Sequence, residues 1–170
     1  MDYLVLSDSH GRTEMIDRAM EVQLRAPDAV LFLGDGMRDL RVLEYQDICV
    51  RCVRGNCDFY TQFEGQSAPE HALLEVGAYR ILMMHGHTHG VKGGMDRAVA
   101  FAAQAEADVL LYGHTHAARQ QWLDAGEQFG GQTLKKPLLV CNPGALQDGS
   151  FGTLHVSNQG ILFGFGSLMA

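Results

Sequence analysis

Residues 3–10 read Tyr-Leu-Val-Leu-Ser-Asp-Ser-His, an apolar run that gives way at once to polar side chains. A short apolar run bounded by a polar loop is typical of a buried β-strand. Residues 29–36 repeat the arrangement, because Ala-Val-Leu-Phe-Leu leads there into Gly-Asp-Gly. The two segments therefore predict strands whose loops carry Asp8, His10 and Asp35.

Three more apolar runs further along the chain end in the same way. Each is followed by side chains that can bind metal ions, and each predicts a strand with a polar loop after it. These runs are residues 49–53 followed by Asn56, residues 79–84 followed by His85, and residues 109–112 followed by His114 and His116.

The segments between and after these strands complete the pattern. Thr13 is predicted to cap a helix that runs to residue 24, and Gly77-Ala78 predicts a hairpin between residues 71–76 and 79–84. Alternating strands and helices followed by a β-meander predict one α/β domain over residues 1–170. The further predicted helices are 38–44 and 94–107; the meander strands are 119–123, 138–141, 152–156 and 161–165, of which the last is expected to be an inner strand.

Composition narrows the class of protein. The chain has 170 residues, 46% of them hydrophobic, and a formal net charge of −7, so it can bury a core but lacks the basic balance usual in nucleic-acid binders. No apolar run approaches the ~18 residues of a membrane span. The first strand has no basic leader, so we expect a cytoplasmic protein with reduced thiols. The pair Cys49 and Cys52 is interpreted as two faces of one strand rather than half a zinc site.

The polar loops share a position in the predicted fold. Ligands of open α/β sheets bind at the carboxyl ends of the strands, so we expect these loops to meet. Taken singly, Asp8 could be a helix cap and Asp35 an ordinary turn residue, but five such placements favour a common site. Carboxylate, amide and imidazole ligands suit Mn²⁺, Fe or Zn²⁺. Seven candidate ligands exceed one tetrahedral site and fit two ions if one carboxylate bridges them. The candidates are Asp8, His10, Asp35, Asn56, His85, His114 and His116.

These residues occur in blocks with a familiar order. The blocks resemble those of the calcineurin-like metallophosphoesterases over about residues 3–145, and the short length and G-N-C-D block are most similar to the small prokaryotic phosphodiesterases. The resemblance implies a sandwich of two mixed β-sheets flanked by α-helices and metal-dependent hydrolysis of phosphoric esters. The blocks are Asp8-Ser-His10, Gly34-Asp35, Gly55-Asn56-Cys57-Asp58, His85-Gly-His87, Gly113-His114-Thr-His116 and Asn142-Pro-Gly144.

The resemblance also implies a role for each ligand. Asp8, His10 and His116 would bind the first metal ion, and Asn56, His85 and His114 the second, with Asp35 bridging. His85 is preferred to His87 because it directly follows its strand, which leaves His87 and His89 as substrate-facing or plain loop residues. Mn²⁺ is the first choice of metal, with Fe, Zn and Ni as alternatives.

Cys57 departs from the pattern of many relatives, which carry a histidine there that protonates or orients the leaving group. A thiol with an ordinary pKa near ~8.5 is a poor general acid at neutral pH. Either the leaving groups are good ones, or His87 or a metal-bound water takes over this role. The catalytic candidates are therefore Asp35, Asn56, Cys57 and His87. Asp58 is expected to orient the ring of His10 or His114 or to be an exposed turn residue.

The expected partner is a small phosphodiester or phosphomonoester, with a homodimer or larger homo-oligomer left open. Some proteins that resemble this family, such as the retromer subunit, are binding scaffolds without turnover; the complete ligand set disfavours that alternative. The net charge disfavours a nuclease. The stretch Gly90–Gly94 lacks the spacing of a phosphate-binding P-loop and is predicted to be a helix-entry loop.

Overall fold

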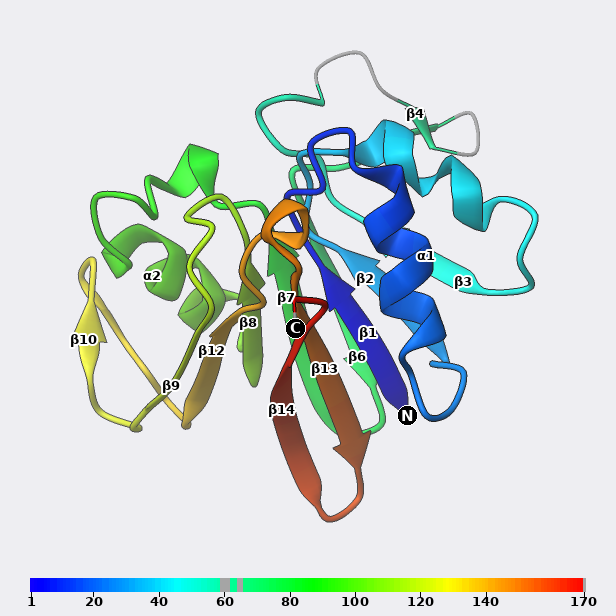
Figure 1. The fold of residues 1–170 in the computed structure, drawn as a ribbon. Coiled ribbons are helices and arrows are strands. Elements are labelled where there is room, and N and C mark those ends of the chain that lie inside the picture. The colour runs from blue at the N-terminus through cyan, green and yellow to red at the C-terminus, as the bar shows by residue number, and fades with distance from the viewer. Residues whose placement is uncertain (59–61, 64–65, 170) are drawn as a thin grey trace.

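The computed structural model describes residues 1–58, 62–63 and 66–169. Two five-stranded β-sheets pack against each other, and helices cover the outer face of each sheet (Figure 1). The predicted α/β sandwich of two mixed sheets flanked by α-helices is therefore confirmed.

The first sheet consists of β1 (Asp2–Leu6), β2 (Ala29–Phe32), β3 (Cys49–Cys52), β13 (Ser150–Ser157) and β14 (Gly160–Ser167). Its strand order is β14-β13-β1-β2-β3. β1, β2 and β3 run parallel to one another, and the β13–β14 hairpin joins antiparallel to β1. The carboxyl ends of the three parallel strands therefore share one edge of the sheet.

The second sheet consists of β6 (His71–Val76), β7 (Tyr79–Met84), β8 (Val109–Tyr112), β9 (Arg119–Leu123) and β12 (Leu138–Asn142). Its strand order is β6-β7-β8-β12-β9. β7, β8 and β12 are parallel, whereas β6 and β9 pair antiparallel at the two edges. The predicted hairpin of β6 and β7 is confirmed with both strands at their predicted bounds.

The remaining elements lie outside the two large sheets. They include helix α1 (Thr13–Glu21), helix α2 (Asp96–Gln104) and three short 3₁₀ helices. Two small ribbons, one of β4 and β5 and one of β10 and β11, complete the described structure. The 3₁₀ helices are η1 (Met37–Leu43), η2 (His87–His89) and η3 (Leu146–Asp148). The ribbon strands are β4 (Gln62–Phe63), β5 (Gln66–Ser67), β10 (Gln128–Phe129) and β11 (Gln132–Thr133).

β1 shows how the layers hold together. Tyr3 and Val5 pack between the two sheets, whereas Leu4 and Leu6 pack on the opposite face among side chains of α1. Successive side chains of a strand point to opposite faces, so a strand buried on both faces has a continuous apolar sequence. Full burial of each such side chain stabilises the fold by about 1.5–3 kcal/mol.

The helix boundaries differ from the prediction. Thr13 is the first residue of α1 rather than its cap, because Arg12 occupies the N-cap position, and the helix ends at Glu21. The Thr13 hydroxyl instead donates to Asp39 Oδ1 (3.4 Å). The second predicted helix is shortened to Asp96–Gln104, since Glu106 takes a left-handed backbone conformation (φ 51°) that ends it.

The prediction of an inner strand at residues 161–165 is wrong. This segment belongs to β14, which lies at the edge of the first sheet and pairs with β13 alone. Because β13 already pairs with β1 on its other side, the second strand of the hairpin is left at the edge. Leu162 and Phe165 are accordingly 70% and 51% exposed.

The interpretation of the Cys49 and Cys52 pair as one strand is confirmed by β3. Cys52 packs against the core beneath α1, while Cys49 is exposed. Among the helices described here, none has the length and apolar character that a membrane crossing requires.

Candidate metal centre

The polar loops of the two sheets meet at one edge of the sandwich. Asp8 follows β1 and accepts a hydrogen bond from the backbone N–H of His114, which follows β8 (3.1 Å). The ring of His85, which follows β7, bonds through Nδ1 to the carbonyl of Leu33 at the end of β2 (2.8 Å). The expected convergence of strand ends therefore brings loops of both sheets into direct contact.

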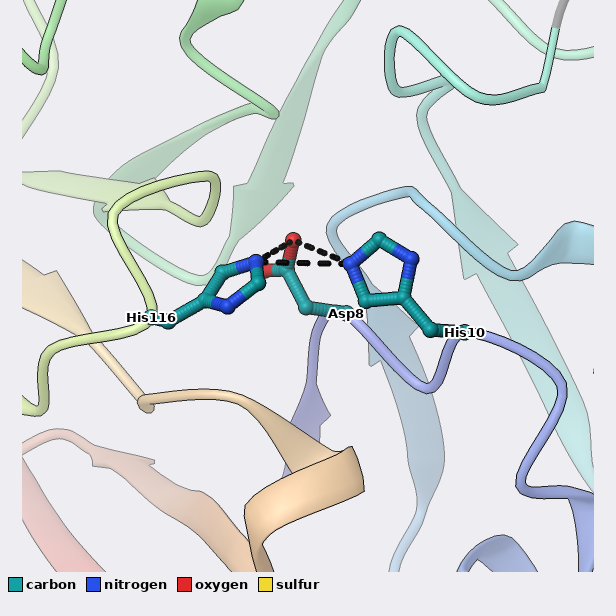
Figure 2. Close-up of side chains that lie close together, drawn as sticks. All are labelled: Asp8, His10 and His116. Carbon is teal, nitrogen blue, oxygen red and sulfur yellow. Dashed lines mark hydrogen bonds and ion pairs between the residues drawn. The ribbon is translucent and has the colours of Figure 1, made fainter.

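Asp8, His10 and His116 form a first group of possible ligand atoms (Figure 2). Asp8 Oδ1 lies 3.1 Å from His116 Nε2 and 3.6 Å from His10 Nε2. The two ring nitrogens are 3.3 Å apart. Two imidazoles and a carboxylate that converge in this way provide suitable ligands for a divalent transition metal.

Asp35, His85 and His114 form a second group. Asp35 Oδ2 lies 3.3 Å from His85 Nε2, which in turn lies 3.2 Å from His114 Nδ1. The Nδ1 atom of His85 faces the Leu33 carbonyl and can donate to it, so Nε2 is the atom that would bind a metal ion after losing any proton it carries.

The two groups adjoin. His10 Nε2 of the first group lies 4.0 Å from Asp35 Oδ2 of the second, and His85 Nε2 lies 4.0 Å from Asp8 Oδ1. Six of the seven predicted ligands thus form one continuous cluster, with Asp35 next to histidines of both groups.

Two buried oxygen atoms of this region have no hydrogen-bond donor among the described residues: Asp8 Oδ1 and Asn56 Oδ1. Buried polar atoms nearly always have a partner, and a carboxylate oxygen left without one is costly. Both atoms belong to predicted metal ligands. A pair of divalent cations would supply the missing positive charge, so the residues present fit the metal ions that the sequence implies.

Backbone conformation sets the predicted ligands apart. Five of them have positive φ angles, a region that costs a non-glycine residue about 1–2 kcal/mol. Glu106 is the one further non-glycine residue with this conformation in the part of the chain described. Such strain gathers at functional sites, where the surrounding structure holds it. The five are Asp8 (56°), His10 (46°), Asp35 (58°), His114 (66°) and His116 (58°).

Among the described residues no histidine ring bonds to Asp58, so the predicted ring contact is wrong, and with 4% exposure it is no surface turn residue either. Its carboxylate accepts hydrogen bonds from four backbone N–H groups, because the loops around it present unpaired donors. The donors are Asp35 (2.7 Å), Gly36 (3.0 Å), Met37 (3.0 Å) and Gly55 (2.9 Å). Asp58 therefore fixes the loop that presents Asp35.

Asp39 supports the loop that carries His10, and nothing in the sequence distinguishes it from an ordinary acidic residue of a short helix. Its buried carboxylate accepts from the hydroxyl of Ser9 (2.6 Å) and from the backbone N–H of Gly11 (2.8 Å). These bonds fix the backbone on either side of His10.

Gly55 permits a close approach that any larger residue would block. A Cβ atom there would lie 2.1 Å from Asp35 Oδ1 and 2.5 Å from the Asp35 backbone nitrogen. Two residues later, the backbone N–H of Cys57 donates a hydrogen bond to Asp35 Oδ1 (2.7 Å). Asp35 is thus held by backbone on one side and by His85 on the other.

The electrostatics keep Asp35 ionised. Burial alone would raise the pKa of Asp35, but hydrogen bonds from His85 and Cys57 and the His85 charge outweigh it, and the pKa is lowered. Burial, and then the charge of Asp35, raises the pKa of the Cys57 thiol. Cys57 lies with His10 and Asp35 in a third group of ligand-type atoms, where its thiol stays protonated.

His87 stands beside the cluster in η2. Its ring centre lies 5.4 Å from that of His85 and 6.2 Å from that of His114. Burial, followed by the charge of His85, lowers the pKa of His87. The Nδ1 atom is buried without a partner among the described residues. His89, by contrast, packs against Phe101 with ring centres 5.0 Å apart.

Solved structures with this fold include both phosphoesterases and other proteins. A predicted phosphoesterase from Streptococcus pneumoniae superposes with a TM-score of 0.71 at 24% identity, covering 98% of this chain and 88% of that one. The structure of a novel archaeal phosphodiesterase gives a TM-score of 0.69 at 20% identity over 97% and 99% of the two chains. Vacuolar protein sorting 29 from Cryptosporidium parvum gives 0.67 at 16% identity over 98% and 97%. At these identities the likeness shows the fold alone.

Sequence similarity is more specific. The chain is 31% identical over 147 residues to a protein of Bacillus subtilis named "Probable metallophosphoesterase YsnB", covering 86% of this chain and 76% of that protein. The family described as "Calcineurin-like phosphoesterase superfamily domain" matches residues 1–158. The chain therefore belongs to the calcineurin-like phosphoesterase superfamily.

Proposed function

We propose that this chain is a phosphodiesterase whose active site is a dinuclear metal centre. The observation that carries the proposal is the continuous cluster of carboxylate and imidazole atoms at the strand ends, together with two buried oxygens that lack a donor among the described residues. Such a donor set fits divalent metal ions and a chemistry of phosphoric esters, in line with the family.

In this proposal Asp8, His10 and His116 hold one ion, Asn56, His85 and His114 hold the other, and Asp35 lies between them. Mn²⁺ is the first choice, with Fe, Zn and Ni as alternatives, since all of them accept this ligand set. When bound, two such ions would neutralise the phosphate oxygens and acidify a shared water for in-line attack on phosphorus.

The remaining chemistry belongs to side chains of the chain itself. The lowered pKa of Asp35 favours its anionic carboxylate, whose two oxygen atoms can each face a different cation. The ring of His87 lies beside the second group, where it would contact a substrate oxygen or a leaving group. The protonated thiol of Cys57 is a weak donor, which suits a leaving group that departs without strong acid assistance.

Because the Cys57 thiol is a weak proton donor, the site favours diesters with good leaving groups over monoesters. An archaeal phosphodiesterase has the same fold, which is compatible with this choice. The substrate we propose is a small phosphodiester rather than a nucleic acid, because the net charge of −7 would repel a polyanion.

A binding scaffold of the same fold is the second candidate, favoured by the likeness to vacuolar protein sorting 29. The two functions differ in turnover rather than in metal binding. The intact cluster, with five of its residues in strained backbone conformations, favours the enzyme.

Metal stoichiometry tests the centre itself. The stripped chain should bind two Mn²⁺ ions, whose electron paramagnetic resonance signal shows magnetic coupling between them. Asp35→Asn should abolish the coupling, whereas Asp47→Asn, at an exposed carboxylate outside the ligand groups, should leave it intact. One bound ion, or two uncoupled ions in the wild type, would contradict the dinuclear proposal.

A further inference from the structure

A cavity of about 550 Å³ lies between the outer face of the second sheet and the segment that leads into α2. Its walls come from β8, β9 and β12 and from residues 91–95, and Phe129 of β10 closes one side. Cavities of roughly 300–1,000 Å³ are the usual size for small organic ligands. Nothing in the proposed metal chemistry uses this space.

The charges of the cavity are all of one sign. Lys92 and Arg119 line it, and no lining residue is acidic. Within the described ranges neither side chain forms an ion pair; the Arg119 guanidinium donates to the neutral amide of Gln121 (2.8 Å). In a chain with a net charge of −7, two cations without carboxylate partners mark a place suited to an anion.

The rest of the wall is largely apolar. Tyr112 and Val140 of the sheet are buried beneath the cavity, and Leu123 and Phe129 border it. An apolar wall with a few polar groups at one side fits a flat organic ring attached to a charged group. Inorganic phosphate alone would leave this wall without a partner.

The cavity adjoins the metal centre. Thr115 and Ala117, which flank His116 in the chain, both line it. One loop therefore presents His114 and His116 to the metal cluster and the residues beside them to the cavity.

The glycine-rich stretch predicted as a helix-entry loop forms part of the same wall. Gly93 and Gly94 line the cavity and carry no side chain that would narrow it. Gly94 has a φ of +154°, which favours glycine at this position. The stretch lacks P-loop spacing, as the sequence indicated, yet it allows a ligand to approach its backbone.

We propose that this cavity binds the part of an organic phosphate ester that lies away from the reacting phosphorus, namely an aromatic ring and a second anionic group held by Lys92 and Arg119. The identity of this ligand as substrate rests on the proposed function. The existence of the site does not, and it can be measured separately.

The test is a titration of the full chain with phenylphosphonate, which has a ring and a charged group but no ester to hydrolyse. Backbone amide NMR follows the titration in the metal-free and the Zn²⁺-loaded protein. In both forms we expect saturable shifts at residues 92–95 and 117–121. Arg119→Gln should weaken this binding about tenfold, because it removes one charge-assisted hydrogen bond. Methylphosphonate, which lacks the ring, should also bind more weakly.

Arg41→Gln is the matched control, since Arg41 is an exposed arginine of η1 outside the cavity; it should bind phenylphosphonate like the wild type. Shifts that avoid the cavity, or an equal loss in both variants, would overturn the inference. With an aryl phosphodiester and Mn²⁺, Arg119→Gln should raise KM and leave kcat unchanged. If the wild-type protein binds phenylphosphonate in the cavity but hydrolyses no ester, the proposed function is refuted while the binding site stands.

Discussion

The Asp58 carboxylate accepts the backbone N–H of Asp35 at 2.7 Å, so one buried acid holds another in place. Three more backbone N–H groups of the same two loops bond to Asp58. The proposed bridging ligand thus owes its position to an acid that does not itself reach the metal cluster. Asp39 has the same relation to the loop of His10.

Asp58→Asn should destabilise the fold by about 2–3 kcal/mol, because an amide removes the charge and replaces one acceptor with a donor that faces other donors. Chemical denaturation measures this loss. Asp47→Asn, at an exposed position, serves as the control and should unfold like the wild type. Equal midpoints for the two variants would mean that Asp58 does not support the loop.

Asp39→Asn should weaken metal binding about tenfold or more, since groups that orient ligands commonly contribute that much. Its kcat at saturating Mn²⁺ should stay close to that of the wild type, because Asp39 contacts the loop and not the cluster. Titration with Mn²⁺ followed by activity separates the two effects. A lower kcat with unchanged metal affinity would contradict this positioning role.

Gly55→Ala should lower both stability and metal binding. The new Cβ would lie 2.1 Å from Asp35 Oδ1, and crowding of this kind costs about 1–3 kcal/mol. Gly93→Ala is the control for stability, since the nearest atom to its Cβ is 3.5 Å away. Thermal unfolding compares the two. If both variants unfold alike, the close approach of Gly55 to Asp35 is not required.

Cys57→His should raise monoesterase activity relative to diesterase activity, because an imidazole can protonate a poor leaving group at neutral pH. The ratio of the two kcat/KM values is the measurement. Cys49→His, on an exposed strand residue, controls for the added histidine and should leave the ratio unchanged. An unaltered ratio in Cys57→His would show that Cys57 does not set the preference.

Much of the architecture could be predicted because it depends on local pattern. Apolar runs at residues 3–6 and 109–112 have the length and composition of buried strands, and both became strands. Parallel strands place their carboxyl ends together, so the loops of Asp8 and Asp35, which follow the neighbouring strands β1 and β2, could be placed side by side from chain order. The contact between Asp8 and His114 joins the two sheets and depends on how they pack.

What could not be predicted depends on packing between distant segments. Asp39 looks like a solvated helix residue until Ser9 and Gly11 are placed against it. The edge position of β14 follows from the pairing of β13 with β1 on its other side. Hydrophobic periodicity along the sequence does not indicate which strands pair. The cavity needs β9 and β10 on one side and Lys92 on the other.

Hydrolysis of bis(4-nitrophenyl) phosphate by the metal-stripped full chain, with and without Mn²⁺, tests the central claim most directly. The account predicts no turnover without metal, restoration by Mn²⁺, and a loss of about 100-fold or more in Asp35→Asn, with Arg41→Gln equal to the wild type. A wild-type chain that binds two ions yet hydrolyses neither this diester nor its monoester with Mn²⁺, Fe²⁺, Zn²⁺ or Ni²⁺ would contradict the account and favour a scaffold.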